Sequence, residues 1–304
     1  MIFMKLLFTC ILLFIFSFSI AQKADNKLQR KLLHEINGFN GDLGIYVKNL
    51  KNGKTAAVNA DSIFPTASMV KIPILIGVMD KIQKDELKYN QELIYKDSLL
   101  YAGVDILGSF KTDEKIELGK LIMLMLTMSD NTASLWLQSL AGTGTTINAI
   151  LDSLGFKSTK VNSRTPGREE NRTMYGWGQT TPREMATLFE RIYKNEIISV
   201  AACERMQRSL ARNFWDGYAN SQIPPYIQVL SKNGAVDESR SEVLLVNGKK
   251  TTYVFCIATK NIKDQSWKND NEAWMLARKI SKLLWEYFEP HDKWNPSTDQ
   301  EKFY

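Results

Sequence analysis

The chain has 304 residues, of which 44% are hydrophobic and 24% charged, with three cysteines and two histidines. These fractions are typical of a soluble globular protein and exclude a disordered, collagen-like or disulfide-scaffold chain. The formal net charge is +6, and no dense Lys/Arg stripe is interleaved with aromatic residues, so we expect no nucleic-acid partner.

The first 21 residues are organised like a secretory signal peptide. Lys5 precedes an apolar run over 6–18, and the small-x-small sequence Ser19-Ile20-Ala21 follows it. We expect cleavage after Ala21, secretion of residues 22–304 to the periplasm or the medium, and no stable membrane insertion afterwards. The alternative is a retained anchor, because the apolar run is near the lower length limit for a spanning helix.

Strand patterns occupy both ends of the remaining chain and helical patterns occupy its middle. The first elements are a helix over 25–37 and a hairpin with strands at 42–48 and 54–59, joined across Lys51-Asn52-Gly53-Lys54. Apolar residues at helical spacing then predict four helices, over 68–83, 116–127, 130–141 and 144–154, the last ending at Gly155.

The second half begins with a segment without clear periodicity, 156–180, which is rich in Ser, Thr, Gly and Arg. A loop of that length in a compact protein is usually functional. Thr181 and Glu184 form a capping box with Pro182 at the first helical position, which predicts a helix to about Asn195. Strands follow over 227–236 and 241–259, with a turn at Asn247-Gly248, and a helix over 271–288 closes the chain.

These elements predict one domain over 22–304 with a two-lobe α/β (α+β) fold. Strands from both ends share one sheet in a lobe formed by about 22–62 and 196–288, and about 63–195 form a helical lobe. Ligands favour clefts between such lobes.

The histidine and cysteine counts restrict the chemistry. His34 and His291 lie near opposite ends of the chain and beside no nucleophile motif, which argues against a Ser-His-Asp or Cys-His enzyme and leaves lysine or a carboxylate as the base. Cys203 and Cys256 are compatible with one disulfide or with buried thiols. No C-x-x-C or zinc spacing is present, and we expect no metal and no cofactor.

A serine and a lysine lie three residues apart at the start of a predicted helix, in Thr66-Ala67-Ser68-Met69-Val70-Lys71. This spacing puts Ser68 and Lys71 on one helix face, where the amine can take the hydroxyl proton if burial or neighbouring cations lower its pKa. S-x-x-K alone is weak evidence, since most matches are solvated helix surface. Here apolar neighbours indicate a buried helix, in which a lysine needs a reason.

Two further motifs have an ordinary reading and a functional one. Ser129-Asp130-Asn131 lies at the junction of two predicted helices, where Ser and Asp are ordinary caps. Lys232-Asn233-Gly234-Ala235 lies on a predicted strand, where it would ordinarily be a strand end with a Gly bulge.

Together and in this order, the three motifs resemble the S-x-x-K, S-D-N and K-T-G set of class A β-lactamases and penicillin-binding proteins. The resemblance covers nearly the whole chain after residue 21. It implies an antiparallel sheet flanked by the terminal helices, plus an all-helical lobe. Asn233 replaces the family threonine, which keeps a hydrogen-bond donor for a substrate carboxylate.

The resemblance also implies roles for individual residues. Ser68 would be the acylated nucleophile, Lys71 its base and Ser129 the proton donor to the departing nitrogen. Lys232 would hold the substrate carboxylate. The remaining roles are substrate binding by Asn131, Asn233, Gly234 and Tyr101, the last of which is also compatible with a core position, and an oxyanion hole from the N–H groups of Ser68 and Ala235.

One family residue is absent from its register. The glutamate that activates the deacylating water would fall at Ser163-Arg164-Thr165-Pro166. Glu169 and Glu170 are the acidic residues of this loop, and either a shifted loop presents one of them as the base or both are surface charges that balance Arg164, Arg168 and Arg172.

The leading hypothesis is an exported, monomeric class A-like β-lactamase that acts through a Ser68 acyl-enzyme. The alternatives are a penicillin-binding D-alanyl peptidase, a Ser/Lys hydrolase of another amide or ester, and a non-catalytic β-lactam or cell-wall binding module. The expected partner is a small β-lactam or a peptidoglycan-like substrate.

Overall fold

The computed structural model describes residues 23–103 and 105–299. Its longer helices are α1 (Asn26–Glu35), α2 (Lys71–Gln83), α3 (Leu118–Thr127), α4 (Asn131–Leu140), α5 (Thr143–Ser153), α6 (Glu169–Tyr175), α7 (Pro182–Tyr193), α8 (Val200–Leu210) and α9 (Glu272–Phe288). Short 3-10 turns are η1 (Ala67–Val70), η2 (Asp97–Leu99), η3 (Leu107–Ser109) and η4 (Ala219–Gln222).

A five-stranded antiparallel sheet joins the two ends of the chain. Its strand order is β2-β1-β10-β9-β8, with bounds β1 (Asp42–Asn49), β2 (Thr55–Val58), β8 (Val229–Val236), β9 (Ser239–Asn247) and β10 (Thr252–Lys260). β1 and β10 pair from Asp42 opposite Lys260 to Asn49 opposite Tyr253. The smaller sheets have the orders β3-β7-β6 and β4-β5, with bounds β3 (Phe64–Pro65), β6 (Lys160–Val161), β7 (Gly178–Thr180), β4 (Glu92–Ile94) and β5 (Lys115–Glu117).

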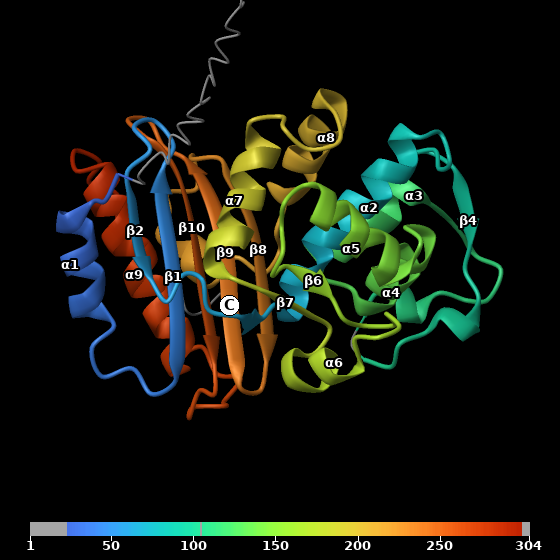
Figure 1. The fold of residues 1–304 in the computed structure, drawn as a ribbon, viewed down its shortest axis with the longest axis horizontal. Helices are drawn as coiled ribbons and strands as arrows, with labels where there is room; N and C mark the ends of the chain where they lie inside the picture. The colour runs from blue at the N-terminus through green and yellow to red at the C-terminus, as the bar shows by residue number, and fades with distance from the viewer. Residues whose placement is uncertain (1–22, 104, 300–304) are drawn as a thin grey trace, which may run out of the picture.

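Both faces of the large sheet are buried, and side chains alternate between two cores. Along β10, Tyr253, Phe255 and Ile257 belong to one core, which α1 and α9 cover. Val254 and Cys256 point the other way, into a core shared with α7 and the helical lobe. Alternation of this kind follows from the two-residue period of a strand. Figure 1 shows the sheet on one side of the molecule and the helices around α2 on the other.

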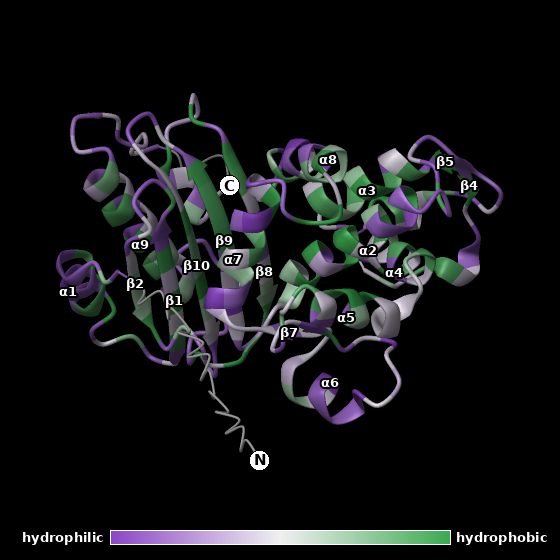
Figure 2. Ribbon diagram, turned by 45° about the horizontal axis from the view of Figure 1, so that its top comes forward, coloured by the Kyte–Doolittle hydropathy of each residue, from purple (hydrophilic) through white to green (hydrophobic). Residues whose placement is uncertain are grey.

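The helical lobe is built around α2. Every residue of α2 from Lys71 to Asp80 is buried, and the helix packs against α4 and α5. Figure 2 shows apolar colour concentrated on these inner helices and on the sheet, and polar colour on outer turns and on α6. Lys71 is therefore a buried lysine in an otherwise apolar helix, as the apolar residues beside it in the sequence predict.

The two-lobe fold, its antiparallel sheet and its terminal helices are confirmed. α7 begins as the capping box predicts, since the Thr181 side chain accepts a hydrogen bond from Glu184 N at 3.1 Å. α7 packs against β1, β9, β10 and α8.

Two differences from the sequence-based expectations concern local structure. The segment 156–180 is not a loop without structure, because it contains β6, α6 and β7. α8 was not predicted from the sequence. The N-cap residue Ser199, whose side chain accepts a hydrogen bond from Ala202 N, is a local signal for the start of this helix.

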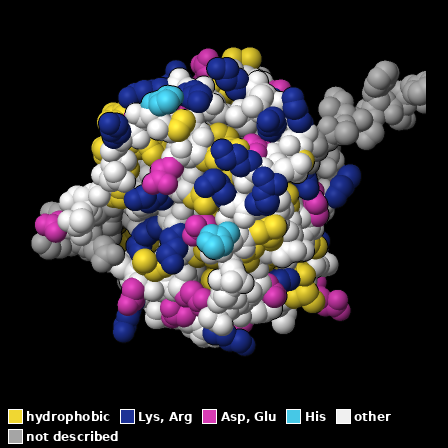
Figure 3. Space-filling model, turned by 90° about the vertical axis from the view of Figure 1, so that its left-hand side faces the viewer, with side chains coloured by type: hydrophobic (Ala, Val, Ile, Leu, Met, Phe, Trp, Pro, Cys, Tyr) yellow, Lys and Arg dark blue, Asp and Glu magenta, His cyan; other side chains and the backbone are white. Residues whose placement is uncertain are grey.

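Cys203 and Cys256 are both free and buried, so the buried-thiol alternative is confirmed. The predicted signal peptide, residues 1–21, lies outside the described residues. Within 23–103 and 105–299, no helix is long and apolar enough to cross a membrane. On the side of the molecule shown in Figure 3, lysine and arginine side chains are numerous, and acidic and neutral ones are interspersed among them.

Candidate active site

Ser68 lies in η1, between β3 and the first turn of α2. Antiparallel pairing of Phe64 with Thr180 and of Pro65 with Gln179 fixes the chain that leads into this turn. Ala67, the residue before the serine, has φ +42°, a left-handed conformation that costs a non-glycine residue about 1 kcal/mol or more. The fold therefore holds the serine on a strained turn, as is common at functional sites.

Lys71 is fully buried and contacts both serines of the predicted site. Its Nζ lies 3.0 Å from Ser68 Oγ, 3.0 Å from Ser129 Oγ and 2.9 Å from Asn131 Oδ1, and it also donates to the Ser129 carbonyl. Burial lowers the pKa of Lys71 well below its usual value, and the nearby charge of Lys232 lowers this pKa further. A neutral amine at this position can accept a proton from either hydroxyl.

The Ser129-Asp130-Asn131 segment acts both as a helix cap and as part of the site. Asp130 is the N-cap of α4, and its carboxylate accepts hydrogen bonds from Ala133 N at 2.7 Å and Leu107 N at 2.8 Å. Ser129 has φ +59°, which turns its backbone just before the helix begins. The cap thus sets the orientation of Ser129 toward Lys71, so the two readings of the motif are compatible.

A second carboxylate, Asp105, supports this junction and was not expected from the sequence. Its Oδ2 accepts hydrogen bonds from Asn131 N at 2.9 Å and Thr132 N at 2.8 Å. Both amides belong to the first turn of α4, where donors lack partners within the helix. Asp105 comes from a loop far away in sequence, and no local pattern marks it.

β8 forms the opposite wall of the site and lies against the turn that carries Ser68. A Cβ on Gly234 would stand 2.5 Å from Thr66 O and 2.7 Å from Ser68 N, so only glycine allows this approach. Ala235, the next residue, lines the same cleft as Ser68. Gly234 is therefore explained by a close contact with the backbone of the Ser68 turn, and not by a bulge at the end of the strand.

Lys232 is fully buried on β8, and burial lowers its pKa to about 7. Its Nζ donates to Asn233 O at 3.0 Å and to Asn233 Oδ1 at 3.3 Å. Glu242, opposite Asn233 on β9, is buried on the other face of the sheet, and burial raises its pKa to about 7. Each of these charges favours ionisation of the other across the sheet.

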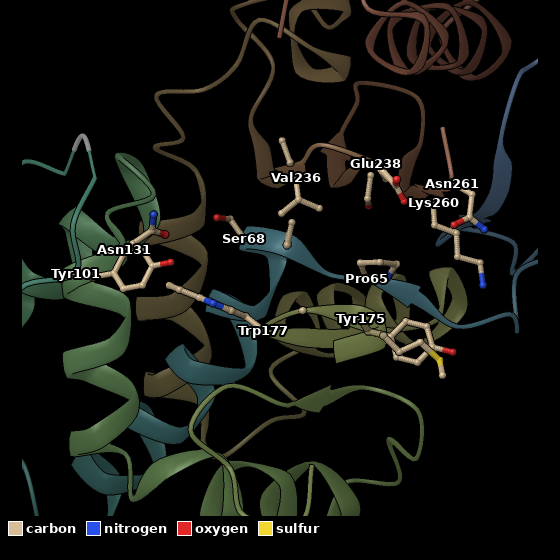
Figure 4. A pocket seen from close by; sticks show the side chains of 15 residues that line it. Pro65, Ser68, Tyr101, Asn131, Tyr175, Trp177, Val236, Glu238, Lys260 and Asn261 are labelled. Carbon is tan, nitrogen blue, oxygen red and sulfur yellow. The ribbon is translucent and has the colours of Figure 1, made fainter. Parts of the chain in front are cut away.

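The cleft between the two walls has a volume of about 490 Å³. Ser68 faces into it from one side and Asn131 from another, and Tyr101 and Trp177 lie at one end (Figure 4). The rings of Tyr101 and Trp177 meet edge to face at 5.1 Å, and Tyr101 is 41% exposed. Tyr101 is therefore a wall of the cleft rather than a core residue, and Trp177 is a wall residue that the sequence did not indicate.

Glu169 and Glu170 lie in the first turn of α6 and are exposed. Neither lines the cleft, and Glu169 Oε1 accepts a hydrogen bond from Gly167 N at 3.1 Å. The structure does not bring either carboxylate to Ser68. Arg168, which was expected to balance them, instead donates to Asn162 Oδ1 at 2.8 Å and Gln179 Oε1 at 2.7 Å, within the loop itself.

Comparison with known proteins shows which family the chain resembles. The sequence model of the beta-lactamase enzyme family matches residues 26–288. Beta-lactamase VEB-1 of Pseudomonas aeruginosa is 24% identical over 293 residues, covering 91% of this chain and 95% of that protein. Beta-lactamase BRO-1 of Moraxella catarrhalis is 22% identical over 269 residues, covering 86% and 84%.

Solved structures share the fold. PBP-A superposes with a TM-score of 0.78 at 23% identity, covering 88% of this chain and 98% of its own. A beta-lactamase from Chitinophaga pinensis DSM 2588 superposes with a TM-score of 0.77 at 19% identity, covering 86% and 99%. The family match spans every segment that forms the cleft walls described above, and the chain belongs to the beta-lactamase enzyme family.

Proposed function

We propose that the protein hydrolyses the amide bond of β-lactams through an acyl-enzyme on Ser68. Membership in the beta-lactamase enzyme family supports a hydrolase that acts on this bond. The observation that carries the serine mechanism is the buried Lys71 amine, which lies 3.0 Å from the hydroxyls of both Ser68 and Ser129. One base thus serves a nucleophile and a proton donor.

In the first half of the reaction, Lys71 takes the Ser68 proton while Oγ bonds to the carbonyl carbon. The carbonyl oxygen becomes negative and is stabilised by the N–H groups of Ser68 and Ala235, which typically contributes 10²–10³ in rate per donor. The carbon–nitrogen bond then breaks. Ser129 gives its proton to the departing nitrogen and regains one from the Lys71 ammonium, so the protons balance.

In the second half, water hydrolyses the Ser68 ester. With Glu169 and Glu170 exposed and outside the cleft, we assign the water proton to the neutral amine of Lys71, which returns it to Ser68 as the ester bond breaks. A variant of PBP-A has been solved as an acyl-enzyme complex with penicillin G, which supports an ester of this kind in the same fold.

Lys232, as an ammonium, would attract the carboxylate of the substrate, and the Asn233 amide would add a hydrogen-bond donor. Asn131 would contact the amide of the acyl side chain, and Tyr101 would form the aromatic wall at the mouth of the cleft. We further propose export by the signal over residues 1–21 and a monomeric state. Both are testable by the N-terminal sequence of the protein recovered from cell fractions and by its sedimentation.

The test is time-resolved mass spectrometry of residues 22–304 with benzylpenicillin, beside absorbance of a chromogenic cephalosporin. We expect an adduct of the whole penicillin mass that appears and disappears while product accumulates. Ser68→Ala should show neither adduct nor product, whereas Ser153→Ala, a serine on the surface of α5, should behave as the wild type. Turnover by the Ser68→Ala variant would contradict the proposal.

The loop carboxylates provide a separate test. Glu169→Gln/Glu170→Gln should retain kcat within about twofold, because neither carboxylate lines the cleft. Lys71→Met should lower acylation by about 10²–10⁴, the usual contribution of a general base. If the double variant accumulated the adduct while the wild type did not, one of the glutamates would be the deacylation base.

A further inference from the structure

The cleft continues beyond the residues that the proposed chemistry uses. Its far end, opposite Tyr101, is lined by Tyr175, Glu238, Lys260 and Asn261 (Figure 4). Lys260 is the last residue of β10, and β9 separates this strand from β8, which carries Ala235. Two strand spacings put the Lys260 backbone about 10 Å from that of Ala235. The far end of the cleft therefore lies two strands away from the strand that carries the oxyanion donor Ala235, within reach of an extended acyl side chain.

Lys260 has hydrogen-bonding capacity that the protein does not use. Its Nζ donates to Ile63 O at 3.1 Å and lies 5.3 Å from the centre of the Phe64 ring. An ammonium has three donors, and this contact takes one of them. Within residues 23–103 and 105–299, no carboxylate oxygen lies within 4.0 Å of this nitrogen.

A carboxylate lies on the facing wall. Glu238, in the turn between β8 and β9, is exposed and extends toward the same end of the cleft as Lys260 (Figure 4). Within the described ranges, the one hydrogen bond that its side-chain carboxylate accepts is from Gln265 Nε2, at 3.3 Å. Two opposite charges thus border the end of the cleft, each with room for a further partner.

The walls between Ser68 and these charges are mostly apolar, and Ser239 is the polar residue that lines them as well. Pro65 and Val236 line this stretch, and Tyr175 extends it toward Lys260. A ligand that reaches from the oxyanion strand to the charged end therefore needs an apolar spacer. A head group with a single charge would meet one favourable and one repulsive neighbour, whereas a head group with both charges would satisfy both.

We propose that this end of the cleft is a subsite for an acyl side chain that ends in an α-amino acid head. The side-chain carboxylate would pair with Lys260, the side-chain ammonium with Glu238, and a short alkyl spacer would cover Pro65 and Val236. The proposal rests on the proposed function, since the head is placed by the amide that Ser68 attacks. It adds a substrate class to that function, namely β-lactams with zwitterionic side chains.

The test compares four cephalosporins that share one nucleus and differ in the acyl group: hexanoyl, adipoyl, 6-aminohexanoyl and α-aminoadipoyl. We expect kcat/KM for the α-aminoadipoyl compound to exceed that of the hexanoyl compound about tenfold, mainly through KM, because charged hydrogen bonds form on binding. Lys260→Met and Glu238→Gln should each remove most of this advantage and leave the hexanoyl compound within twofold of the wild type.

Matched variants separate this effect from folding and from total charge. Lys263→Met removes an exposed lysine outside the cleft and should change none of the four values. Lys260→Arg keeps the charge and should keep the preference. α-Aminoadipoyl-D-alanyl-D-alanine presents the same head group on a peptide. Its hydrolysis would assign the subsite to a peptide substrate, whereas the absence of hydrolysis would assign the subsite to a β-lactam.

Equal kcat/KM for the four compounds would overturn the subsite while leaving the Ser68 acyl-enzyme intact. A preference for the adipoyl or the 6-aminohexanoyl compound would overturn it as well, because one charge alone would then suffice. Absence of adduct and product with all four would instead overturn the proposed function.

Discussion

At the scale of single residues, two buried lysines with lowered pKa values predict the pH profile. Lys71 must be neutral to act as a base, so activity falls when the pH drops below its lowered pKa. Lys232 must be protonated to attract a carboxylate, and its pKa of about 7 predicts that kcat/KM declines above about pH 7. The bound carboxylate raises the pKa of Lys232, so kcat should decline at higher pH than kcat/KM does. Coincident alkaline limbs would contradict this role for Lys232.

A substitution of Glu242 should shift the alkaline limb of the pH profile without shifting the acid limb. Its carboxylate ionises at about pH 7 and then raises the pKa of Lys232 from the other face of the sheet. Glu242→Gln should therefore move the alkaline limb of kcat/KM to lower pH and leave the acid limb in place. Glu289→Gln, which removes another buried carboxylate, is the control. An unchanged alkaline limb in Glu242→Gln would rule out the coupling.

At the scale of elements, the contact between β8 and the Ser68 turn depends on Gly234. The Cβ of Gly234→Ala would overlap Thr66 O and Ser68 N, both backbone atoms that cannot rotate away. We expect the strand to move from the nucleophile and kcat to fall about 100-fold or more, the usual loss for one oxyanion donor. Gly103→Ala, in a loop where an added Cβ meets no heavy atom within 4 Å, should leave kcat unchanged. Acylation and deacylation rates from stopped-flow absorbance would measure both.

The elements also show how far the sequence determines the site. The helix at Ser68 and Lys71, the cap at Asp130 and the strand at Lys232 are all visible as local patterns, and the structure brings these segments together. Asp105 and Lys260 reach the site through loop path and strand order, which no short pattern encodes. The same holds for the 156–180 segment, whose path depends on pairing between β3, β7 and β6.

At the scale of the whole molecule, Cys203 and Cys256 report on global unfolding. Both belong to the core that the sheet shares with the helical lobe, and burial raises the pKa of each thiol. In residues 22–304 we expect a thiol reagent to label neither cysteine under native conditions and both after denaturation, with rates that follow unfolding. Reducing agent should leave Tm unchanged, because no disulfide links them. Rapid labelling of the native protein would mean that this core opens locally.

The pairing of β1 with β10 has a consequence for synthesis on the ribosome. The N-terminal hairpin emerges early, but the strand that completes its pairing ends at Lys260. At translation rates of 5–20 residues per second, the edge of β1 that pairs with β10 remains unpaired for roughly 10–40 s. During that interval the chain exposes an unpaired strand edge, which favours pairing with another chain or capture by a chaperone.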